Sequence, residues 1–434
     1  MMRRIASLLG AFAFATPGVA HAQEALADVA DTGDTAWILT STALVLMMTL
    51  PGLILFYGGL LRAKNVLSVM VQCGAIAAVA SLLWIVCGYT MAFGAVTSGW
   101  LGAGNAWMLI DLGNVRDGYL VPENSFALFQ MTFAAITPAL MAGAWVDRAR
   151  FGWVVAFCAL WGLVVYAPVA HWVWGGGWLA SQFGTLDFAG GIVVHTTAGV
   201  SALVIAALLG KRQGFPKTLM LPHSPVLVMI GAGLLWVGWF GFNGGSAVAA
   251  NDDAASAIIN THAAACAAAM AWLVIERFMV GKSTAIGFAT GAVAGLATVT
   301  PAAGFISPGA ALIFGLVAAC ICYPMIKVIK SKLEIDDSLD VFAVHGMGGM
   351  AGSLLLAVFM APAFGGTGDA ATYSIAGQLG GQAVGVFVVA IWSALASALL
   401  ALGISWLMPM RVSDDTEREG LDIASHGERG WEFD

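Results

Sequence analysis

Apolar residues in this chain gather into long runs with few charges, and short polar segments separate the runs. About 20 apolar residues in an α-helix span a bilayer, because each residue adds about 1.5 Å of rise. Eleven runs are long enough, and each is predicted to be a transmembrane helix. They are residues 36–61, 66–94, 124–145, 151–170, 188–209, 225–244, 254–279, 285–301, 306–328, 341–362 and 378–408. The predicted fold class is an all-α integral membrane protein with eleven transmembrane helices.

Composition agrees with the membrane class. Of the 434 residues, 60% are hydrophobic and 10% are charged, whereas about a quarter of a soluble domain is charged. The first segment differs from the predicted spans, because a basic pair (Arg3 and Arg4), a short apolar stretch and an Ala-His-Ala motif are typical of a cleavable secretory signal. The predicted domains are a signal peptide (1–22), an eleven-helix domain with a central pore (23–410) and an acidic cytosolic tail (411–434).

Charge placement predicts the orientation. A secretory signal leaves the mature N-terminus outside, and eleven spans then place the C-terminus in the cytoplasm. Outside the signal, Arg116 is the only one of the 18 Lys and Arg residues predicted on the outer side. Cytoplasmic loops of membrane proteins are enriched in Lys and Arg, so this distribution supports the count of eleven.

Two histidines lie deep within predicted spans, where ionisable residues usually mark a functional site. His195 lies eight residues after Asp187, a natural N-cap for the fifth span. His345 lies five to nine residues into the tenth span, after the capping cluster at 336–340. Eight helical residues rise about 12 Å, so both rings approach the midplane from opposite sides. This antisymmetry predicts an inverted five-plus-five helix repeat plus one extra C-terminal helix, with the site at the repeat interface.

Other reactive side chains are expected to be structural. His262 is interpreted as a packing histidine, and the six cysteines as small packing residues with no disulfide or zinc site. A membrane enzyme that uses Asp187, His195 and His345 as a catalytic or metal site is an alternative. No HExxH or GxSxG motif and no nucleotide-binding loop supports it. We therefore expect a protein that is not an enzyme, with no cofactor and no bound metal.

At these residues the sequence resembles a known family. The segment DFAGGIVVHTTAGVSALVIAALLGKR (187–212) is similar to the signature of the ammonium transporter (Amt/Rh) family, in its bacterial Amt branch. Further blocks resemble the family in the same order along nearly the whole mature chain. They are FYGGLLRAKN (56–65), AHWVWGGGWLAS (170–181), GWFGFNGGSA (238–247), TPAAGFIS (300–307) and DVFAVHGMGG (340–349). The resemblance implies a homotrimer with one pore in each subunit.

The resemblance also implies an outer site and a gate. An outer recruitment site would be made by Trp174, Phe129 and Ser246, and two stacked rings, Phe133 and Phe242, would close the pore below it. Trp has the aromatic face that attracts a cation best, and a serine hydroxyl can accept an N–H bond. Composition alone leaves other interpretations open: an interfacial aromatic belt for Trp174, and core packing for the two phenylalanines.

Within the pore, the resemblance implies that His195 and His345 are twin histidines of a narrow apolar channel. Asp187 would be a buried acid that orders the outer site without binding the substrate directly. An apolar pore favours deprotonation, because a buried ion is costly and ammonium can lose a proton to become ammonia. Potassium cannot do so. Whether the proton crosses separately, or the protein is a passive ammonia gas channel, stays open.

The tail and the family suggest partners and a location. Residues 417–428 (EREGLDIASHGE) look like the family's cytosolic tail, which couples to PII-type signalling proteins in nitrogen assimilation. This keeps an ammonium-sensing receptor open as an alternative to a transporter. The expected substrate is ammonium or ammonia, with methylammonium as an analogue. The expected location is the bacterial inner membrane, and no nucleic-acid partner is expected.

Overall fold

The computed structural model describes residues 30–104, 107–218 and 220–431, so the predicted signal peptide lies outside the described residues. Eleven helical segments in these ranges are long and apolar enough to cross a membrane. They are Thr32–Leu60, Ala63–Phe93, Glu123–Trp145, Phe151–Phe183, Gly191–Leu209, Pro225–Gly244, Asp252–Met279, Ala285–Ala302, Pro308–Lys332, Phe342–Phe359 and Ile375–Ser405. The prediction of eleven spans is therefore confirmed.

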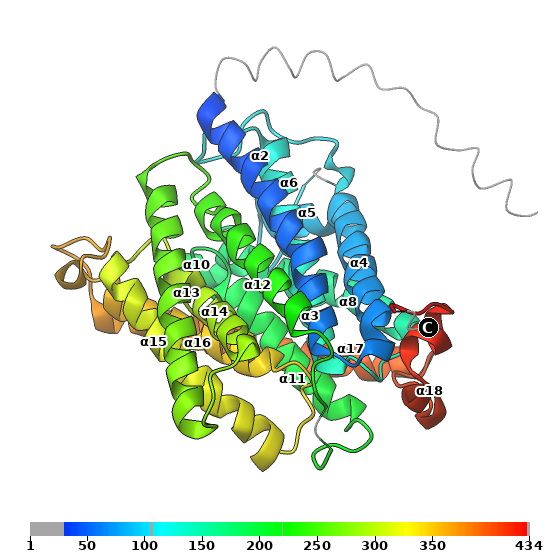
Figure 1. Ribbon diagram of the computed structural model, residues 1–434. Coiled ribbons are helices and arrows are strands. Elements are labelled where there is room, and N and C mark those ends of the chain that lie inside the picture. Colours follow the sequence, from blue (N-terminus) through cyan, green and yellow to red (C-terminus); the bar gives the residue numbers. More distant parts are fainter. Residues whose placement is uncertain (1–29, 105–106, 219, 432–434) are drawn as a thin grey trace, which may run out of the picture.

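The first five spans are built from ten α-helices (Figure 1). These are α2 (Thr32–Met47), α3 (Ile54–Leu60), α4 (Val66–Leu83), α5 (Tyr89–Phe93), α6 (Glu123–Leu140), α7 (Ala142–Trp145), α8 (Phe151–Trp161), α9 (Ala167–Val173), α10 (Trp178–Phe183) and α11 (Thr197–Leu209). Two short strands, β1 (Ala95–Val96) and β2 (Gly102–Ala103), pair antiparallel between the second and third spans.

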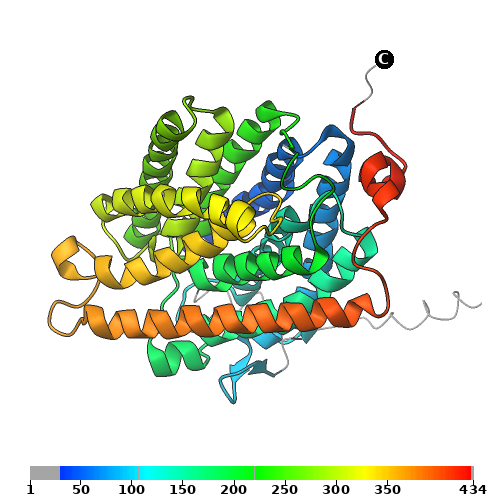
Figure 2. The ribbon, with the colours of Figure 1, turned by 90° about the horizontal axis from the view of Figure 1, so that it is seen from below.

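The remaining spans each contain one long α-helix, and a short helix belongs to the tail. They are α12 (Pro225–Trp239), α13 (Asp252–Met279), α14 (Ala285–Val299), α15 (Pro308–Lys327), α16 (Met347–Phe359) and α17 (Ile375–Ser405), followed by α18 (Asp414–Glu419). Figure 2 shows α17 lying along the outside of the bundle, in keeping with its prediction as an extra C-terminal helix.

The fourth span is longer than predicted. Its apolar pattern was expected to end at residue 170, but the helix continues to Val173 and a further helix, α10, follows. The glycines at 175–177 interrupt the pattern because the chain turns tightly there. A side chain on Gly175 would meet the Ala92 carbonyl oxygen at 2.0 Å, and Gly176 has a φ of +81°. The turn therefore needs glycine, and it leaves Trp174 at the outer end of the bundle.

Three of the predicted pore residues lie on π-helical turns. His195 lies in η6 (Gly191–Thr196), Phe242 in η7 (Phe240–Gly244) and His345 in η10 (Phe342–Gly346). Such turns are rare in proteins and are frequent at functional sites. In each of the fifth and tenth spans the π-turn comes first and a regular α-helix follows it.

The fifth and tenth spans mirror one another in detail. Asp187 accepts N–H bonds at the start of the fifth span, and Asp337 accepts the Phe342 N–H bond at the start of the tenth (2.7 Å). Each aspartate precedes the histidine of its own span by eight residues. The sequence left the cap of the tenth span open within 336–340, and the structure assigns it to Asp337. This geometry agrees with the predicted inverted repeat.

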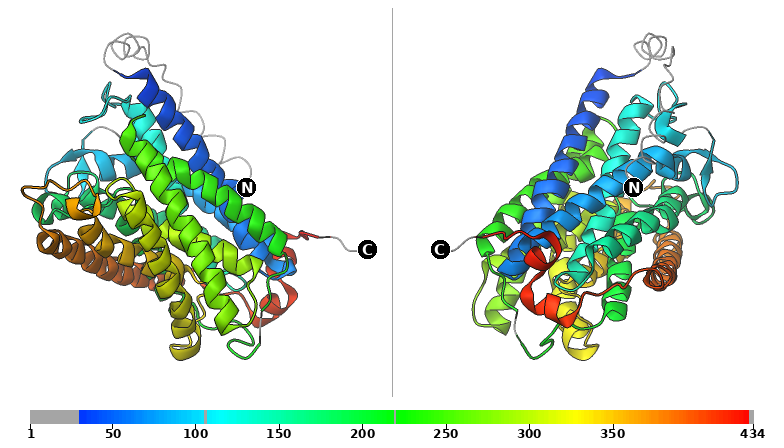
Figure 3. Two further views of the ribbon diagram at one scale, coloured as in Figure 1. Left: turned by 60° about the vertical axis from the view of Figure 1, so that its left-hand side comes forward. Right: turned by 90° about the vertical axis from the view of Figure 1, so that its right-hand side faces the viewer.

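The tail packs against the inner end of the bundle, beside the start of α4 (Figure 3). The Asp422 carboxylate accepts the N–H groups of Leu67 and Ser68 (3.1 and 2.8 Å), and so caps α4. The Leu421 N–H donates to the Asn65 side chain at 2.8 Å. Glu417 accepts the Gln213 N–H at 2.7 Å. These bonds hold the tail on loops that a charged sequence pattern alone would leave in solvent.

Candidate functional site: a row of cavities through the bundle

A cavity of about 420 Å³ opens at the outer end of the bundle. Its wall includes Trp174, Ser246, Asp187 and Gln130. Trp174 is held in place because its indole N–H donates to the Asp187 carbonyl oxygen at 2.7 Å. The Ser246 hydroxyl donates to the Phe242 carbonyl oxygen at 2.8 Å. Since its hydrogen is used in that bond, the hydroxyl can offer only lone pairs to a ligand.

The Asp187 carboxylate is fully occupied by backbone donors. It accepts four N–H bonds of 2.7–2.9 Å, from Gly190, Gly191, Ile192 and Val193. Burial raises the pKa of Asp187 to about 6, and the four N–H donors oppose that rise. Both carboxylate oxygens are occupied by these donors. Asp187 therefore acts on the outer cavity through its negative charge and through its backbone carbonyl oxygen, which holds Trp174 in place.

Two stacked phenylalanine rings lie next to the outer cavity, in contact with Trp174 and Ser246 of its wall. The rings of Phe133 and Phe242 lie 4.2 Å apart with an interplanar angle of 29°. Both residues are about 1% exposed, and the Trp174 ring meets Phe133 edge-on at 5.9 Å. Phe129 is also buried, and its ring centroid lies 5.0 Å from that of Phe133, one helical turn further along α6. The expectation that Phe129 walls the recruitment site stays a prediction, because its ring packs against Phe133, whose ring in turn meets Trp174.

Below the two rings, His195 and His345 come together. Their Nδ1 atoms lie 3.3 Å apart and their ring centroids 5.2 Å apart. Because one Nδ1 must donate and the other accept, the two neutral rings hold opposite tautomers, and their Nε2 atoms offer one N–H and one lone pair. Nε2 of His195 is buried with no partner among the described residues. The space beside the rings is about 10 Å³, close to the size of one water molecule.

The helices of the histidines approach closely because each carries a glycine one turn further on. A side chain on Gly199 would lie 2.3 Å from the Gly346 backbone, and one on Gly349 would lie 2.7 Å from His195 Cβ. Small residues of this kind allow membrane helices to pack backbone against backbone. The glycines therefore set the distance between the two rings.

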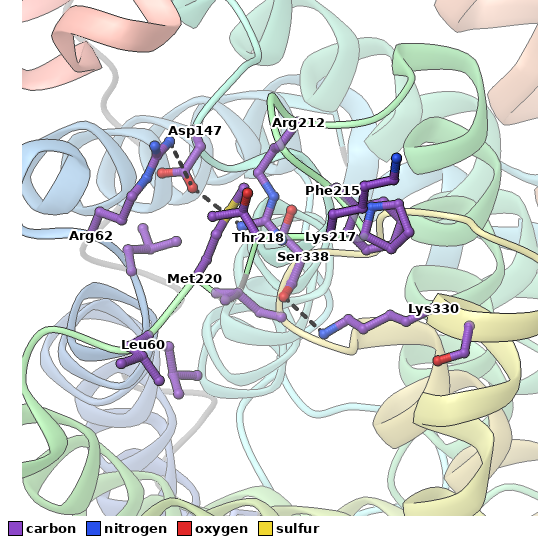
Figure 4. A pocket seen from close by; sticks show the side chains of 15 residues that line it. Leu60, Arg62, Asp147, Arg212, Phe215, Lys217, Thr218, Met220, Lys330 and Ser338 are labelled. Atoms are coloured by element: carbon purple, nitrogen blue, oxygen red, sulfur yellow. Dashed lines mark hydrogen bonds and ion pairs between the residues drawn. The ribbon is translucent and has the colours of Figure 1, made fainter.

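Two further cavities lie on the inner side. One, of about 180 Å³, has His345 and Tyr57 in its wall, as does the narrow space beside the histidines. The other, of about 280 Å³, shares Lys330 and Ser338 with the first. Figure 4 shows Lys330 reaching Ser338 across this second cavity, opposite a group in which Asp147 joins Arg62 and Arg212. The cavities thus form a row from the outer end to the inner end, interrupted by the phenylalanines.

The inner ion network is buried and fully paired around Asp336. Arg212 donates two side-chain bonds to its carboxylate, at 2.8 and 2.9 Å. Burial acts to raise the pKa of Asp336, but the hydrogen bonds and charge of Arg212 outweigh it and hold the pKa below its usual range. Arg148 donates to the Asp336 carbonyl oxygen and to Ser338. These contacts fix the loop that precedes the tenth span.

Some side chains of the predicted spans are exposed. His262 is exposed on α13, where its ring packs against Trp236 and Phe240. Cys320 is also exposed, while Cys73, Cys158 and Cys322 are buried. A hydropathy pattern cannot distinguish a helix face that meets neighbouring helices from one that faces outward. Within the described ranges, no cluster of three or more metal-ligating side chains occurs.

Sequence reasoning missed Gln130. It lies within the apolar stretch ALFQMTF beside Phe129, and the structure places it in the wall of the outer cavity. A polar residue inside a predicted span was the signal that could have found it. Asp337 was missed as an individual residue for a different reason, because several acids at 336–340 offered the same cap.

The fold and the row of cavities define a multi-pass membrane protein with a narrow path through its helical bundle. The model of the Ammonium Transporter Family matches residues 36–431. The chain is 44% identical to an ammonium transporter of Aquifex aeolicus, covering 92% of this chain and 94% of that protein. It is 39% identical to an ammonium transporter of Bacillus subtilis, covering 92% and 98%. The chain belongs to the ammonium transporter family.

Solved structures share the fold. The crystal structure of Candida albicans Mep2 superimposes with a TM-score of 0.83 at 36% identity, covering 90% of this chain and 88% of Mep2. A structure described as a sensor Amt protein superimposes with a TM-score of 0.84 at 29% identity, covering 91% and 98%. The family consists of transporters, in agreement with the expectation of a protein that is not an enzyme.

Proposed function

We propose that this protein transports ammonium by recruiting the cation in the outer cavity, removing a proton and passing ammonia along the narrow path beside the histidines. The observation that carries the proposal is the closed apolar gate between a wide outer cavity and a space the size of one small molecule. A hydrated cation does not fit that space. A neutral ammonia molecule does.

Recruitment rests on the outer cavity. The interaction of a cation with the aromatic face of Trp174 contributes about 2 kcal/mol or more of binding free energy once the cation is partly desolvated. Ser246 supplies a lone pair for one N–H group. Asp187 adds negative charge close to the cavity while its oxygens remain bound to the backbone. Together these residues favour a small cation with N–H donors.

Selectivity follows from deprotonation at the gate. Moving a charged ion past Phe133 and Phe242 costs several kcal/mol of lost hydration, with no ligands there to replace the water. Ammonium avoids that cost by releasing a proton, whereas potassium has no proton to release. Below the gate, the histidine pair offers one donor and one acceptor, which suits ammonia. The same two groups also suit a proton relay, since each ring can receive a proton on one nitrogen and release it from the other.

The cellular setting follows the family. We place the protein in the bacterial inner membrane, as a homotrimer with one pore in each subunit. Its tail is docked against the inner loops. A PII-type signalling protein that binds this tail and the inner loops would control transport from the cytosolic side.

A receptor that binds ammonium without significant flux is a second candidate. It is favoured by the structural similarity to a protein described as a sensor Amt protein. The two candidates differ in one measurable property, because a receptor binds the cation and passes little or none of it.

Purified protein in proteoliposomes decides between these candidates. An ammonium pulse should evoke a current in wild-type vesicles if charge crosses, and His195→Ala should abolish the current or admit potassium. Uptake without current indicates a passive ammonia channel. Binding with no uptake by either measure overturns transport in favour of a receptor.

A further inference from the structure

Gln130 is a buried amide without a hydrogen-bond partner among the described residues. It lies on α6, is 8% exposed and lines the outer cavity. No hydrogen bond joins its side chain to any described residue, and its Oε1 atom is enclosed. Buried polar groups in folded proteins are almost always hydrogen-bonded, because an unmet donor or acceptor is destabilising. An amide in this position therefore needs a partner that the described part of the chain does not supply.

Three other polar residues of the same wall already have partners. Asp187 is held by four backbone donors, and Ser246 donates to Phe242. Arg116 pairs with Glu123 at 3.3 Å and its guanidinium also lies 4.9 Å from the ring of Phe126. Gln130 differs from Asp187 and Ser246, because neither atom of its side-chain amide bonds to a described residue.

An uncommitted amide can present either atom to the cavity. Rotation of the terminal amide exchanges its oxygen and nitrogen, and here the exchange breaks no hydrogen bond to a described residue. A cation in the cavity favours the orientation that turns the oxygen toward it, because a carbonyl oxygen accepts N–H bonds and carries partial negative charge. The side chain can therefore adapt to an ammonium ion without any change in the helix.

We propose that Gln130 binds ammonium directly in the outer cavity, where its side-chain oxygen accepts an N–H bond alongside the Ser246 hydroxyl. This inference rests on the proposed function of that cavity. The aromatic face of Trp174 supplies attraction without direction, whereas two oxygen acceptors fix the position of the ion above the gate. Gln130 is then an affinity-determining residue.

The test is Gln130→Met, which keeps the length of the side chain and removes its oxygen. Loss of a hydrogen bond to a charged ligand should raise the KM for methylammonium uptake about tenfold or more. The maximal rate should change little, because the gate and histidines are untouched. Gln130→Glu keeps an oxygen acceptor and should keep a KM at or below that of wild type.

Gln72→Met is the matched control. Gln72 is also a buried amide of a membrane span, but Ser68 and Trp145 hold it at 3.2 and 3.1 Å. This variant should lower the thermal midpoint and leave the KM unchanged. An unchanged KM in Gln130→Met, or a Gln130→Glu variant as weak as Gln130→Met, would overturn the assignment of Gln130 as a ligand.

Calorimetric titration with methylammonium separates this assignment from transport itself. If wild-type vesicles show no flux, the transport proposal fails. Weaker binding by Gln130→Met than by wild type would still support Gln130 as a ligand in that case. Equal binding by the two proteins would overturn it.

Discussion

The crossing of the fifth and tenth spans offers a sharp test of the histidine pair, through the substitution Gly199→Ala. The added Cβ would lie 2.3 Å from the Gly346 Cα and N atoms, whereas ordinary contact begins at 3.4 Å. The obstacle is backbone, so no side chain can rotate away. The two helices must separate by about 1 Å, which is the difference between these distances.

That separation is enough to break the contact between the rings. The Nδ1 atoms of His195 and His345 are 3.3 Å apart, and a further displacement of about 1 Å exceeds hydrogen-bonding distance. Overpacking costs about 1–3 kcal/mol, while replacing glycine by alanine within a helix recovers about 0.5–1 kcal/mol. We expect a folded variant that has lost the fixed tautomers of the pair.

The assay is the ammonium-evoked current and methylammonium uptake of proteoliposomes, with potassium as competitor. Gly199→Ala should lose most of its flux, and Gly349→Ala should do the same from the other helix. Gly233→Ala on α12 is the matched control, because nothing lies within 4 Å of its added Cβ. If Gly199→Ala matches Gly233→Ala in flux and in discrimination against potassium, ring contact is not needed for transport.

Further predictions concern the cap, the recruitment site and the inner ion network. Asp187→Asn offers one acceptor oxygen to four N–H groups, so its thermal midpoint in detergent should fall and its flux should be lost; a wild-type midpoint contradicts the capping role. Because the pKa of Asp187 is raised to about 6, its negative charge is lost as pH falls through that value. Wild-type flux, measured at fixed ammonium and with equal pH on both sides, should therefore fall as the pH is lowered from 7 to 5. A flux that stays constant over this range would contradict a role for the Asp187 charge in transport. Ser246→Ala removes an acceptor for a charged ligand and should raise the KM about tenfold or more, which a KM equal to wild type would refute. Arg212→Met leaves the buried Asp336 unpaired and should cost about 3–5 kcal/mol of unfolding free energy, measured by thermal unfolding; unchanged unfolding would show that the pair is dispensable.

The sequence by itself determined the number of spans, and it predicted the orientation and the depth of His195 and His345. These properties depend on residues that are close in sequence. The rise per residue of a helix turns the number of residues from the start of a span into a depth in the bilayer, and a run of apolar residues identifies each span. The eight-residue interval from Asp187 to His195 needed no tertiary information. The family blocks then supplied roles for the aromatic residues.

Only the tertiary structure decided which side chains face one another. It stacked Phe133 on Phe242, put Gln130 in the wall of the outer cavity and left His262 exposed. It also docked the acidic tail on the start of α4, where Asp422 caps the helix. Such outcomes depend on how helices distant in sequence rotate and pack against each other, and a span that is apolar on every side carries no periodic signal for that choice.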